Sequence, residues 1–189
     1  MLNIPGEDKD KVLHYYNESH PYYKMDIAIV GAGNSAVDVA LDTFRKGAKS
    51  VTMIIRESEI GQNVKYWSKP DIVNRIKEGS IDAHFNSQIE EITEDHVRFK
   101  TPKGVKTIEN EFVLAMTGYQ PNFELLESLG VEFQEDEYRT PVFDPNTMQS
   151  NTEGVYLAGV VCGGLKTNKW FIENSRDHAP LIIEHLAQK

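Results

Sequence analysis

Residues 27–36 read IAIVGAGNSA, an apolar run that leads into a turn with two glycines and then into small side chains. A strand that ends in G-x-G-x-x-A and opens a helix is typical of a dinucleotide-binding turn. The first glycine can adopt backbone angles that a side chain forbids, and the second lets the main chain approach a pyrophosphate. The amides and the positive dipole end of the helix start attract that anion. The candidate nucleotide contacts are Gly31, Gly33, Asn34, Ser35 and Ala36.

The residues after the turn complete a strand-helix-strand unit. Apolar side chains recur at helical spacing over residues 37–44, and Arg45-Lys46-Gly47 is typical of a helix end. A second apolar run at residues 51–55 supplies the next strand, within about 30 residues of the first. This context favours a Rossmann-like α/β domain that binds a dinucleotide over a glycine turn without a ligand.

The residue that ends the second strand indicates which nucleotide binds. Arg56 lies 20 residues after Ala36, where an acidic residue would bind the ribose of NAD and an arginine suits the extra phosphate of NADP. A guanidinium offers a planar set of donors to a phosphate, so we favour NADPH over NADH as the cofactor. Glu57 could take the acidic role if the strand ends one residue later. Lys65 could add a second cation, or it could be a solvated surface lysine.

Size and charge limit the alternatives. A chain of 189 residues can bury one good core, whereas two full domains would be tight. Its net charge of −9 gives no support to a nucleic-acid partner. No apolar run approaches membrane-spanning length, and the N-terminus does not resemble a signal peptide. The single cysteine, Cys162, excludes an intrachain disulfide. We therefore expect a cytoplasmic protein with no membrane partner.

The rest of the chain divides into segments of different character. Residues 1–24 show no clear period and are interpreted as a linker or strap, and residues 25–118 as the nucleotide-binding domain. Within that domain, alternation from residue 82 to residue 108 predicts short antiparallel strands, a β-meander, and the run 112–116 predicts a strand buried on both faces that rejoins the parallel sheet. A final amphipathic helix is predicted over residues 172–186, kinked at Pro180.

Taken in order, these motifs resemble the thioredoxin-reductase-like branch of the pyridine nucleotide-disulfide oxidoreductases, and within it the bacillithiol disulfide reductases. The resemblance rests on PGED at residues 5–8, GAGNSA at 31–36, AMTGYQPN at 115–122, GVYLAG at 154–159 and NKWFIEN at 168–174. It implies an NADPH domain inserted into an FAD domain. Residues 1–24 would connect the FAD domain to the NADPH domain, and residues 119–189 would complete the FAD domain. It also implies FAD contacts at Thr117, Gly118 and Gly159.

The chain departs from that family pattern in three places. It has no second G-x-G-x-x-G for FAD, no C-x-x-C pair, and valine at residue 160 where the family usually has an aspartate. We therefore expect an incomplete FAD site. The resemblance implies the NADPH-binding portion of a flavin-dependent oxidoreductase that reduces a low-molecular-weight thiol disulfide, inactive as this isolated chain. Without a partner for its tail, the chain is expected to form a homo-oligomer or to carry a disordered tail.

No residue of the chain is assigned to catalysis or to metal binding. Cys162 could be a redox thiol near a flavin, but the absence of a second cysteine favours a small buried apolar residue. The six histidines show no metal-binding spacing. Two other classes of function remain open: a self-contained, non-enzymatic NADPH-binding module, and a thiol-independent NADPH:flavin reductase.

Overall fold

The structure is a computed structural model that describes residues 2–62 and 64–188. The described residues form two compact units, which divide between Gly118 and Tyr119. We call them the N-terminal unit and the C-terminal unit. Each has its own clusters of buried apolar side chains.

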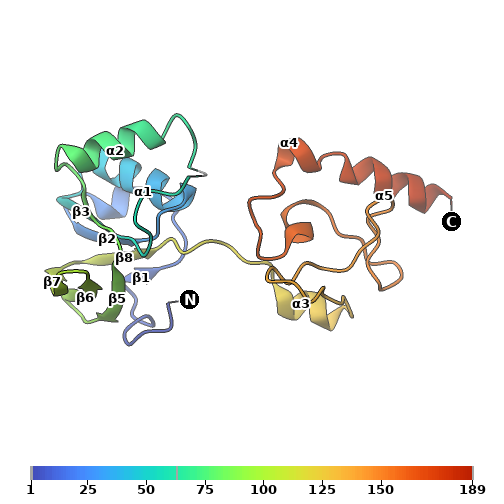
Figure 1. The fold of residues 1–189 in the computed structure, drawn as a ribbon, viewed down its shortest axis with the longest axis horizontal. Coiled ribbons are helices and arrows are strands. Elements are labelled where there is room, and N and C mark those ends of the chain that lie inside the picture. Colours follow the sequence, from blue (N-terminus) through green and yellow to red (C-terminus); the bar gives the residue numbers. More distant parts are fainter. Residues whose placement is uncertain (1, 63, 189) are drawn as a thin grey trace. The chain divides into compact units, whose positions relative to one another are not determined.

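A five-stranded parallel sheet forms the centre of the N-terminal unit (Figure 1). Its strands lie in the order β1 (Val12–Leu13), β8 (Phe112–Ala115), β2 (Asp26–Val30), β3 (Ser50–Ile54) and β4 (Asp82–His84). α1 (Asn34–Arg45) connects β2 to β3, and α2 (Lys69–Lys77) lies between β3 and β4 in the chain. Ile27 of β2 is opposite Val51 on one side and Phe112 on the other. The predicted strand-helix-strand unit is therefore confirmed.

The two faces of this sheet are covered by different kinds of structure (Figure 1). α1 and α2 cover one face, and the other is covered by an antiparallel sheet of β5 (Gln88–Ile92), β6 (His96–Thr101) and β7 (Gly104–Glu109). Alternate residues of β2 pack into the hydrophobic cores on the two sides of the sheet, because successive side chains of a strand point to opposite faces. Ile27 and Ile29 pack on the helix side, and Ala28 and Val30 pack on the side of the antiparallel sheet. The predicted β-meander and doubly buried strand are confirmed.

Two segments differ from the sequence-based expectation. Val12 and Leu13, within the segment interpreted as a linker, pair in parallel with Val113 and Leu114 of β8. The same segment contains the short helix η1 (His20–Tyr22), whose Tyr22 ring meets Phe112 edge to face. β4, which was placed in the antiparallel meander, joins β3 in parallel instead. Two-residue and three-residue strands are too short to show a period, so only pairing reveals them.

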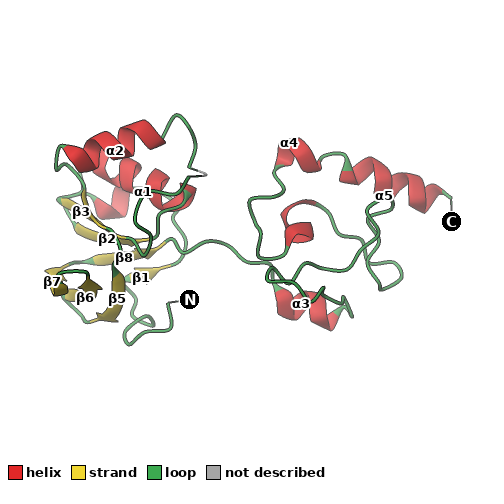
Figure 2. Ribbon diagram, viewed as in Figure 1, coloured by secondary structure: helices red, strands yellow, loops and turns green. Residues whose placement is uncertain are grey.

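The C-terminal unit contains helices and loops (Figure 2). Its helices are α3 (Phe123–Ser128), η2 (Gly159–Gly163), α4 (Ile172–Ser175) and α5 (His178–Ala187). Within its described residues, β structure is limited to isolated bridges such as the one between Phe143 and Ser150. A small core holds the unit together and consists of Leu126, Val131, Met148, Leu157 and Cys162.

The predicted helix over residues 172–186 is two helices in the structure. α4 ends at Ser175 and α5 begins at His178, so the break precedes Pro180 instead of falling on it. Pro180 lies in the first turn of α5, where the backbone N–H groups have no acceptor within the helix. The proline therefore fits a helix start and does not kink a continuous helix.

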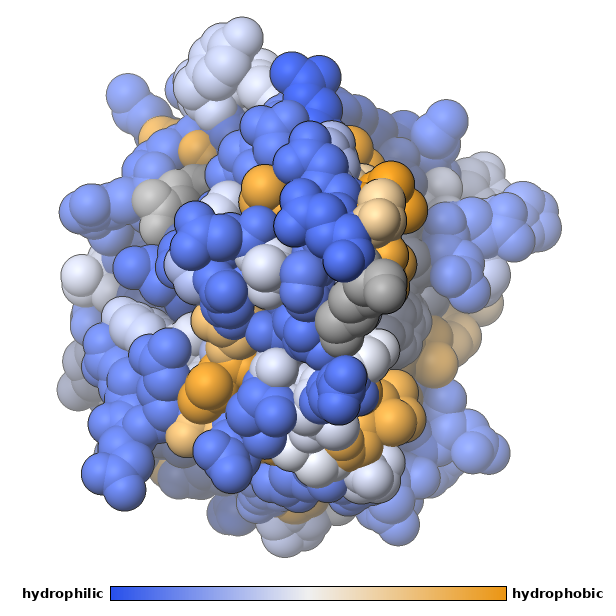
Figure 3. All heavy atoms as spheres, turned by 90° about the vertical axis from the view of Figure 1, so that its right-hand side faces the viewer, coloured by the Kyte–Doolittle hydropathy of each residue, from blue (hydrophilic) through white to orange (hydrophobic). Residues whose placement is uncertain are grey.

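Large apolar side chains remain exposed on the C-terminal unit, among them Phe171, Ile172 and Ile183. Figure 3 shows apolar side chains reaching the surface in several places between hydrophilic ones. Single exposed apolar residues are normal on soluble proteins, whereas a cluster of them points to an interaction.

Replacement of Gly31 by alanine should destabilise the N-terminal unit. Gly31 has a φ of +130°, and a Cβ atom on it would lie 2.4 Å from the carbonyl oxygen of Met116. Both the backbone strain and the steric clash oppose a side chain there, so Gly31→Ala should lower the free energy of unfolding by about 2 kcal/mol or more. Urea denaturation followed by circular dichroism measures this, and an unchanged midpoint would contradict the prediction.

The thiol of Cys162 should be unreactive in the folded protein. Burial raises its pKa from 9.0 to about 11, so the thiol adds stability that is fully present below pH 9.0 and is lost as the pH rises toward 11. At pH 8, alkylation by iodoacetamide should be about 100-fold slower in the native protein than in urea. The native rate should keep rising between pH 9 and 11, whereas the rate in urea levels off. Equal rates in both states would show that the thiol is accessible.

Candidate functional site

The glycine turn lies where the strand order of the parallel sheet reverses. The chain passes from β2 through α1 to β3 on one side, whereas β8 and β1 lie on the other side of β2 (Figure 1). In open α/β sheets, ligands bind in the crevice outside the carboxyl ends of the strands at such a switch point. A ligand at this switch point would therefore meet the residues that follow β2, β3 and β8.

The two glycines of the turn have different surroundings. The amide of Gly31 donates to the carbonyl of Ile54, 3.2 Å away, and the residue packs against the end of β8. Ala36 is fully buried beneath it, so the start of α1 packs closely on the turn. Gly33 is exposed, and no atom lies within 4 Å of the position that a Cβ on it would take. The turn is thus closed toward the sheet at Gly31 and open at Gly33.

The start of α1 is suited to an anion. Gly33 precedes the helix in an extended conformation and has no side chain to cap it. Asn34, Ser35 and Ala36 form the first turn, which contains no acidic residue. The first amides of a helix have no acceptor within it, and the helix dipole adds a partial positive charge there. Phosphate or pyrophosphate is the group that such a helix start holds.

Arg56 and Glu57 lie side by side just beyond β3. Ile55 is fully buried, and the side chains of the next two residues emerge into solvent. The guanidinium of Arg56 is 3.6 Å from the carboxylate of Glu57, a loose and exposed ion pair of little energetic weight. The carbonyl of Glu57 accepts a hydrogen bond from the amide of Asn86, which ties this strand end to the residues after β4. Either side chain is available to a nucleotide ribose.

Lys65 is brought to α1 by the loop that follows β3. Its backbone amide donates to Oδ1 of Asn34 at 2.8 Å, and its Nζ lies 2.7 Å from a carboxylate oxygen of Asp38. Gly61, earlier in the same loop, donates to the carbonyl of Ala32 at 3.0 Å. The loop therefore rests on the glycine turn and on the first two turns of α1. The sequence pattern did not reveal these contacts.

Thr117 and Gly118 follow β8 at the same edge of the sheet. Their neighbour Met116 contacts Gly31, so the end of β8 and the glycine turn adjoin. Both residues are exposed, and Gly118 has a φ of +101° with open space where a side chain would be. The structure therefore brings Thr117 and Gly118 to the edge that also carries the glycine turn.

Gly159 belongs to the C-terminal unit, where it lies beside a buried histidine. Its amide donates to Nδ1 of His178 at 3.1 Å, and Sγ of Cys162 lies 3.9 Å from the same nitrogen. The indole of Trp170 packs edge to face on the His178 ring. Because burial raises the pKa of Cys162, the thiol stays protonated at neutral pH. This favours the interpretation of Cys162 as a buried apolar residue over a redox thiol.

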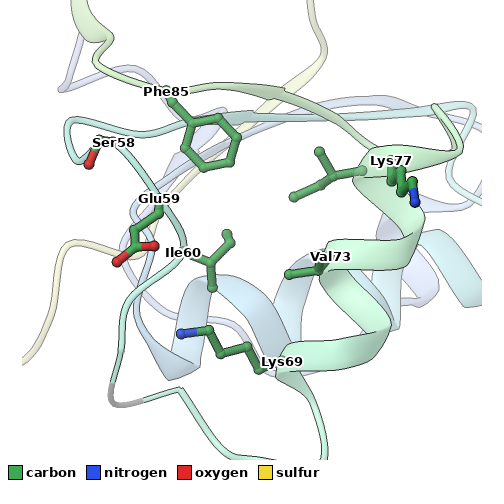
Figure 4. Close-up of a pocket in the computed structure, with 8 residues that line it drawn as sticks. Ser58, Glu59, Ile60, Lys69, Val73, Lys77 and Phe85 are labelled. Carbon is green, nitrogen blue, oxygen red and sulfur yellow. The ribbon is translucent and has the colours of Figure 1, made fainter.

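A cavity of about 360 Å³ lies apart from these residues, between α2 and the loop after β3 (Figure 4). Figure 4 shows Ile60, Val73 and Phe85 around it. Its described lining is Ser58, Glu59, Ile60, Lys69, Val73, Ile76, Lys77 and Phe85. None of these is among the residues predicted to bind a nucleotide. The cavity therefore gives no support to the site at the glycine turn, which rests on backbone geometry.

The described residues contain neither a metal-binding cluster nor a membrane-spanning helix. Between residues 2 and 188, with residue 63 left aside, no group of three or more His, Cys, Asp and Glu side chains is placed to hold a metal ion. In the same part of the chain, none of the helices has the length and apolar character needed to cross a membrane.

Comparison with known proteins places these features in a family. The Bacilliredoxin reductase Bdr of Bacillus subtilis (strain 168) is 41% identical over the whole of this chain, which covers 58% of that protein. Two solved structures cover all of this chain: bacillithiol disulfide reductase Bdr (YpdA) from Bacillus cereus, 38% identical with a TM-score of 0.94, and that from Staphylococcus aureus, 37% identical with a TM-score of 0.92. This chain covers 57% and 59% of those chains.

The chain thus spans less than two thirds of the length of these relatives. Residues 1–159 match the family described as pyridine nucleotide-disulphide oxidoreductase. That match covers most of the chain, including the glycine turn, the end of β3 and Gly159. This chain belongs to the pyridine nucleotide-disulphide oxidoreductase family.

Proposed function

We propose that the N-terminal unit binds NADPH as the electron donor of a flavin-dependent oxidoreductase, and that the disulfide of bacillithiol is its substrate. The observation that carries the proposal is the glycine turn, which is open at Gly33 and leads into a helix start without an acidic residue. Family membership supports the nucleotide and the disulfide chemistry. The names of the two solved relatives support bacillithiol. The name of the B. subtilis relative makes a bacilliredoxin the alternative substrate.

The nucleotide would lie along the carboxyl ends of the strands. In this proposal, the first turn of α1 and the two glycines hold the pyrophosphate, and Arg56 binds the phosphate on the adenosine ribose. Lys65 offers its ammonium group as a hydrogen-bond donor beside the helix start, where that group is paired with Asp38. The residues proposed to contact NADPH are Gly31, Gly33, Asn34, Ser35, Ala36, Arg56 and Lys65.

FAD contacts are proposed at Thr117, Gly118 and Gly159. Both glycines leave open space where a side chain would be, so a flat ring or a ribityl chain could approach their backbones. The amide of Gly159 is already bonded to His178, and the next residue is Val160, so this position offers close approach without a carboxylate. When bound, FAD accepts hydride from NADPH and passes the electron pair to the disulfide.

We assign the disulfide step to no residue of this chain. Cys162 is its single thiol, and that thiol is fully buried with a raised pKa. Attack on a disulfide requires an accessible thiolate. We therefore propose that the 189-residue chain binds NADPH without reducing disulfides by itself.

A second candidate is a thiol-independent NADPH:flavin reductase, which the burial of Cys162 favours. NADPH oxidation measured with added FAD and ferricyanide, with and without bacillithiol disulfide, separates the candidates. Flavin-dependent oxidation that persists in Cys162→Ser would support the second candidate. Oxidation that depends on the disulfide would contradict the inactive-chain proposal. NADPH binding with no FAD retained after ultrafiltration would point to a self-contained NADPH-binding module.

We propose the cytoplasm as the cellular setting and a homo-oligomer as the state in solution. An acidic chain with a single reduced cysteine suits the reducing conditions of a cytoplasm. The apolar side chains left exposed on the C-terminal unit support self-association into a homo-oligomer. Size-exclusion chromatography with light scattering gives the mass of the species in solution, and a monomer at all concentrations would contradict the oligomer.

Replacement of Arg56 should change which nucleotide the chain prefers. A charged hydrogen bond to phosphate is lost in Arg56→Gln, so the Kd for NADPH should rise about 10- to 100-fold while the Kd for NADH stays unchanged. Calorimetric titration of both nucleotides measures this. Glu57→Gln is the matched control, because that side chain lies beside Arg56. A wild-type preference for NADH that Glu57→Gln abolishes would assign the ribose to Glu57 instead.

Replacement of Gly33 should impair binding without unfolding the protein. Gly33 has a φ of −84°, which alanine adopts readily, and its Cβ would enter open space. Gly33→Ala should therefore change the free energy of unfolding by about 0.5 kcal/mol or less. The new methyl group would occupy the proposed pyrophosphate position, so the Kd for NADPH should rise about tenfold or more. Unchanged affinity would show that no phosphate lies at this turn.

A further inference from the structure

Asp38 lies one turn beyond the helix start that is proposed to hold the pyrophosphate. The first turn of α1 contains no acidic residue, so Asp38 carries the first negative charge along that helix. Its side chain is 43% exposed, and its carboxylate lies 2.7 Å from the ammonium group of Lys65. A carboxylate so close to a helix start repels an anion bound there. The pairing of Asp38 with Lys65 therefore bears on nucleotide affinity.

The backbone of Lys65 is fixed independently of its ammonium group. Its amide donates to Oδ1 of Asn34 at 2.8 Å, in the first turn of α1. Gly61, earlier in the same loop, donates to the carbonyl of Ala32 at 3.0 Å. These contacts hold the loop against the glycine turn without help from the lysine side chain. The ammonium group can therefore change its partner while the loop stays in place.

The ammonium group of Lys65 is within reach of the helix start as well as of Asp38. Asn34 and Asp38 are one turn apart, which is about 6 Å along the helix axis. The lysine side chain has a flexible stem of four carbons, and it is 41% exposed. Exposed ion pairs are weak, so the ammonium group can leave Asp38 at little cost. A phosphate held at the start of α1 would be its other partner.

The carboxylate of Asp38 has a second partner. Ser68 immediately precedes α2, and its hydroxyl donates to Oδ1 of Asp38 at 3.4 Å. The Lys65 ammonium group donates to the other oxygen, Oδ2. The carboxylate is therefore still held beside α1 after the ammonium group has left.

We propose that Asp38 and the pyrophosphate of NADPH compete for the ammonium group of Lys65, so that Asp38 lowers the affinity of the site. The inference rests on the proposed function, in which the start of α1 holds the pyrophosphate. Without ligand, the ammonium group pairs with Asp38. On binding it moves to the pyrophosphate, which carries a negative charge on each phosphate and is the stronger partner. Asp38 then loses its cation and repels the anion beside it.

Calorimetric titration with NADPH tests the competition through the sign of one effect. Asp38→Asn keeps the shape of the side chain and removes its charge, so the Kd should fall about threefold. If the ion pair instead fastened the loop for binding, the same variant would raise the Kd. Lys65→Met removes the cation that the pyrophosphate would gain, so its Kd should rise about fivefold or more.

The double variant separates competition from simple repulsion. In Lys65→Met there is no ammonium group to release, so adding Asp38→Asn should lower the Kd by a smaller factor than it does in the wild type. An equal factor in both backgrounds would show that Asp38 repels the anion without holding Lys65 back. That result would overturn the inference.

The control for charge is Glu94→Gln, which removes one negative charge elsewhere in the same unit. Glu94 lies between β5 and β6, and its carboxylate pairs with Lys9 at 3.3 Å. The Kd for NADPH should stay unchanged in this variant, and a gain equal to that of Asp38→Asn would overturn the inference. If Asp38→Asn leaves the Kd unchanged or raises it, the inference is wrong and the proposed function stands. If the wild-type chain does not bind NADPH, the proposed function fails and the inference fails with it.

Discussion

The close approach of Gly31 to the carbonyl of Met116 joins the ends of β2 and β8 at the sheet edge where we propose that the nucleotide binds. β2 and β8 both end there, and a side chain on Gly31 would collide with β8. The glycine lets the turn close against the sheet, which directs Gly33 and the start of α1 outward. The same contact keeps Thr117 beside the turn, so the proposed nucleotide site adjoins the residues that lead into the C-terminal unit. This arrangement of the edge requires a residue without a Cβ atom at position 31.

The sequence predicted those parts of the fold in which apolar residues recur at the spacing of a helix or a strand. β2, α1 and β3 show strand and helix patterns over five residues or more, and the doubly buried β8 is nearly all apolar. β1 and β4 could not be predicted, because strands of two and three residues show no period and are defined by their neighbours. Pro180 misled the prediction for a similar reason, since a proline at a helix start and one at a kink look alike without the preceding break.

The candidate site was predictable where a motif fixes the backbone. The glycine turn follows from the spacing of its residues, whereas the support of the turn by Gly61 and Lys65 joins residues about 30 positions apart and leaves no local signal. Neither the sequence pattern nor the fold decides whether Arg56 or Glu57 contacts the ribose, because adjacent exposed residues at a strand end can each reach it. For Cys162 the structure does decide between the two interpretations, because the side chain is fully buried and belongs to the core.

The position of β8 has a consequence for how the chain is made. β8 lies between β1 and β2 in the sheet, yet it follows both of them by more than 80 residues in the sequence. On a ribosome, β2 and β3 can pair early, but β1 has no partner until residues 112–115 emerge. Such non-local pairing is slow because the intervening chain must first be closed into a loop. During synthesis, the vacant edge of β2 is therefore the surface at which a wrong strand could insert and a chaperone would be useful.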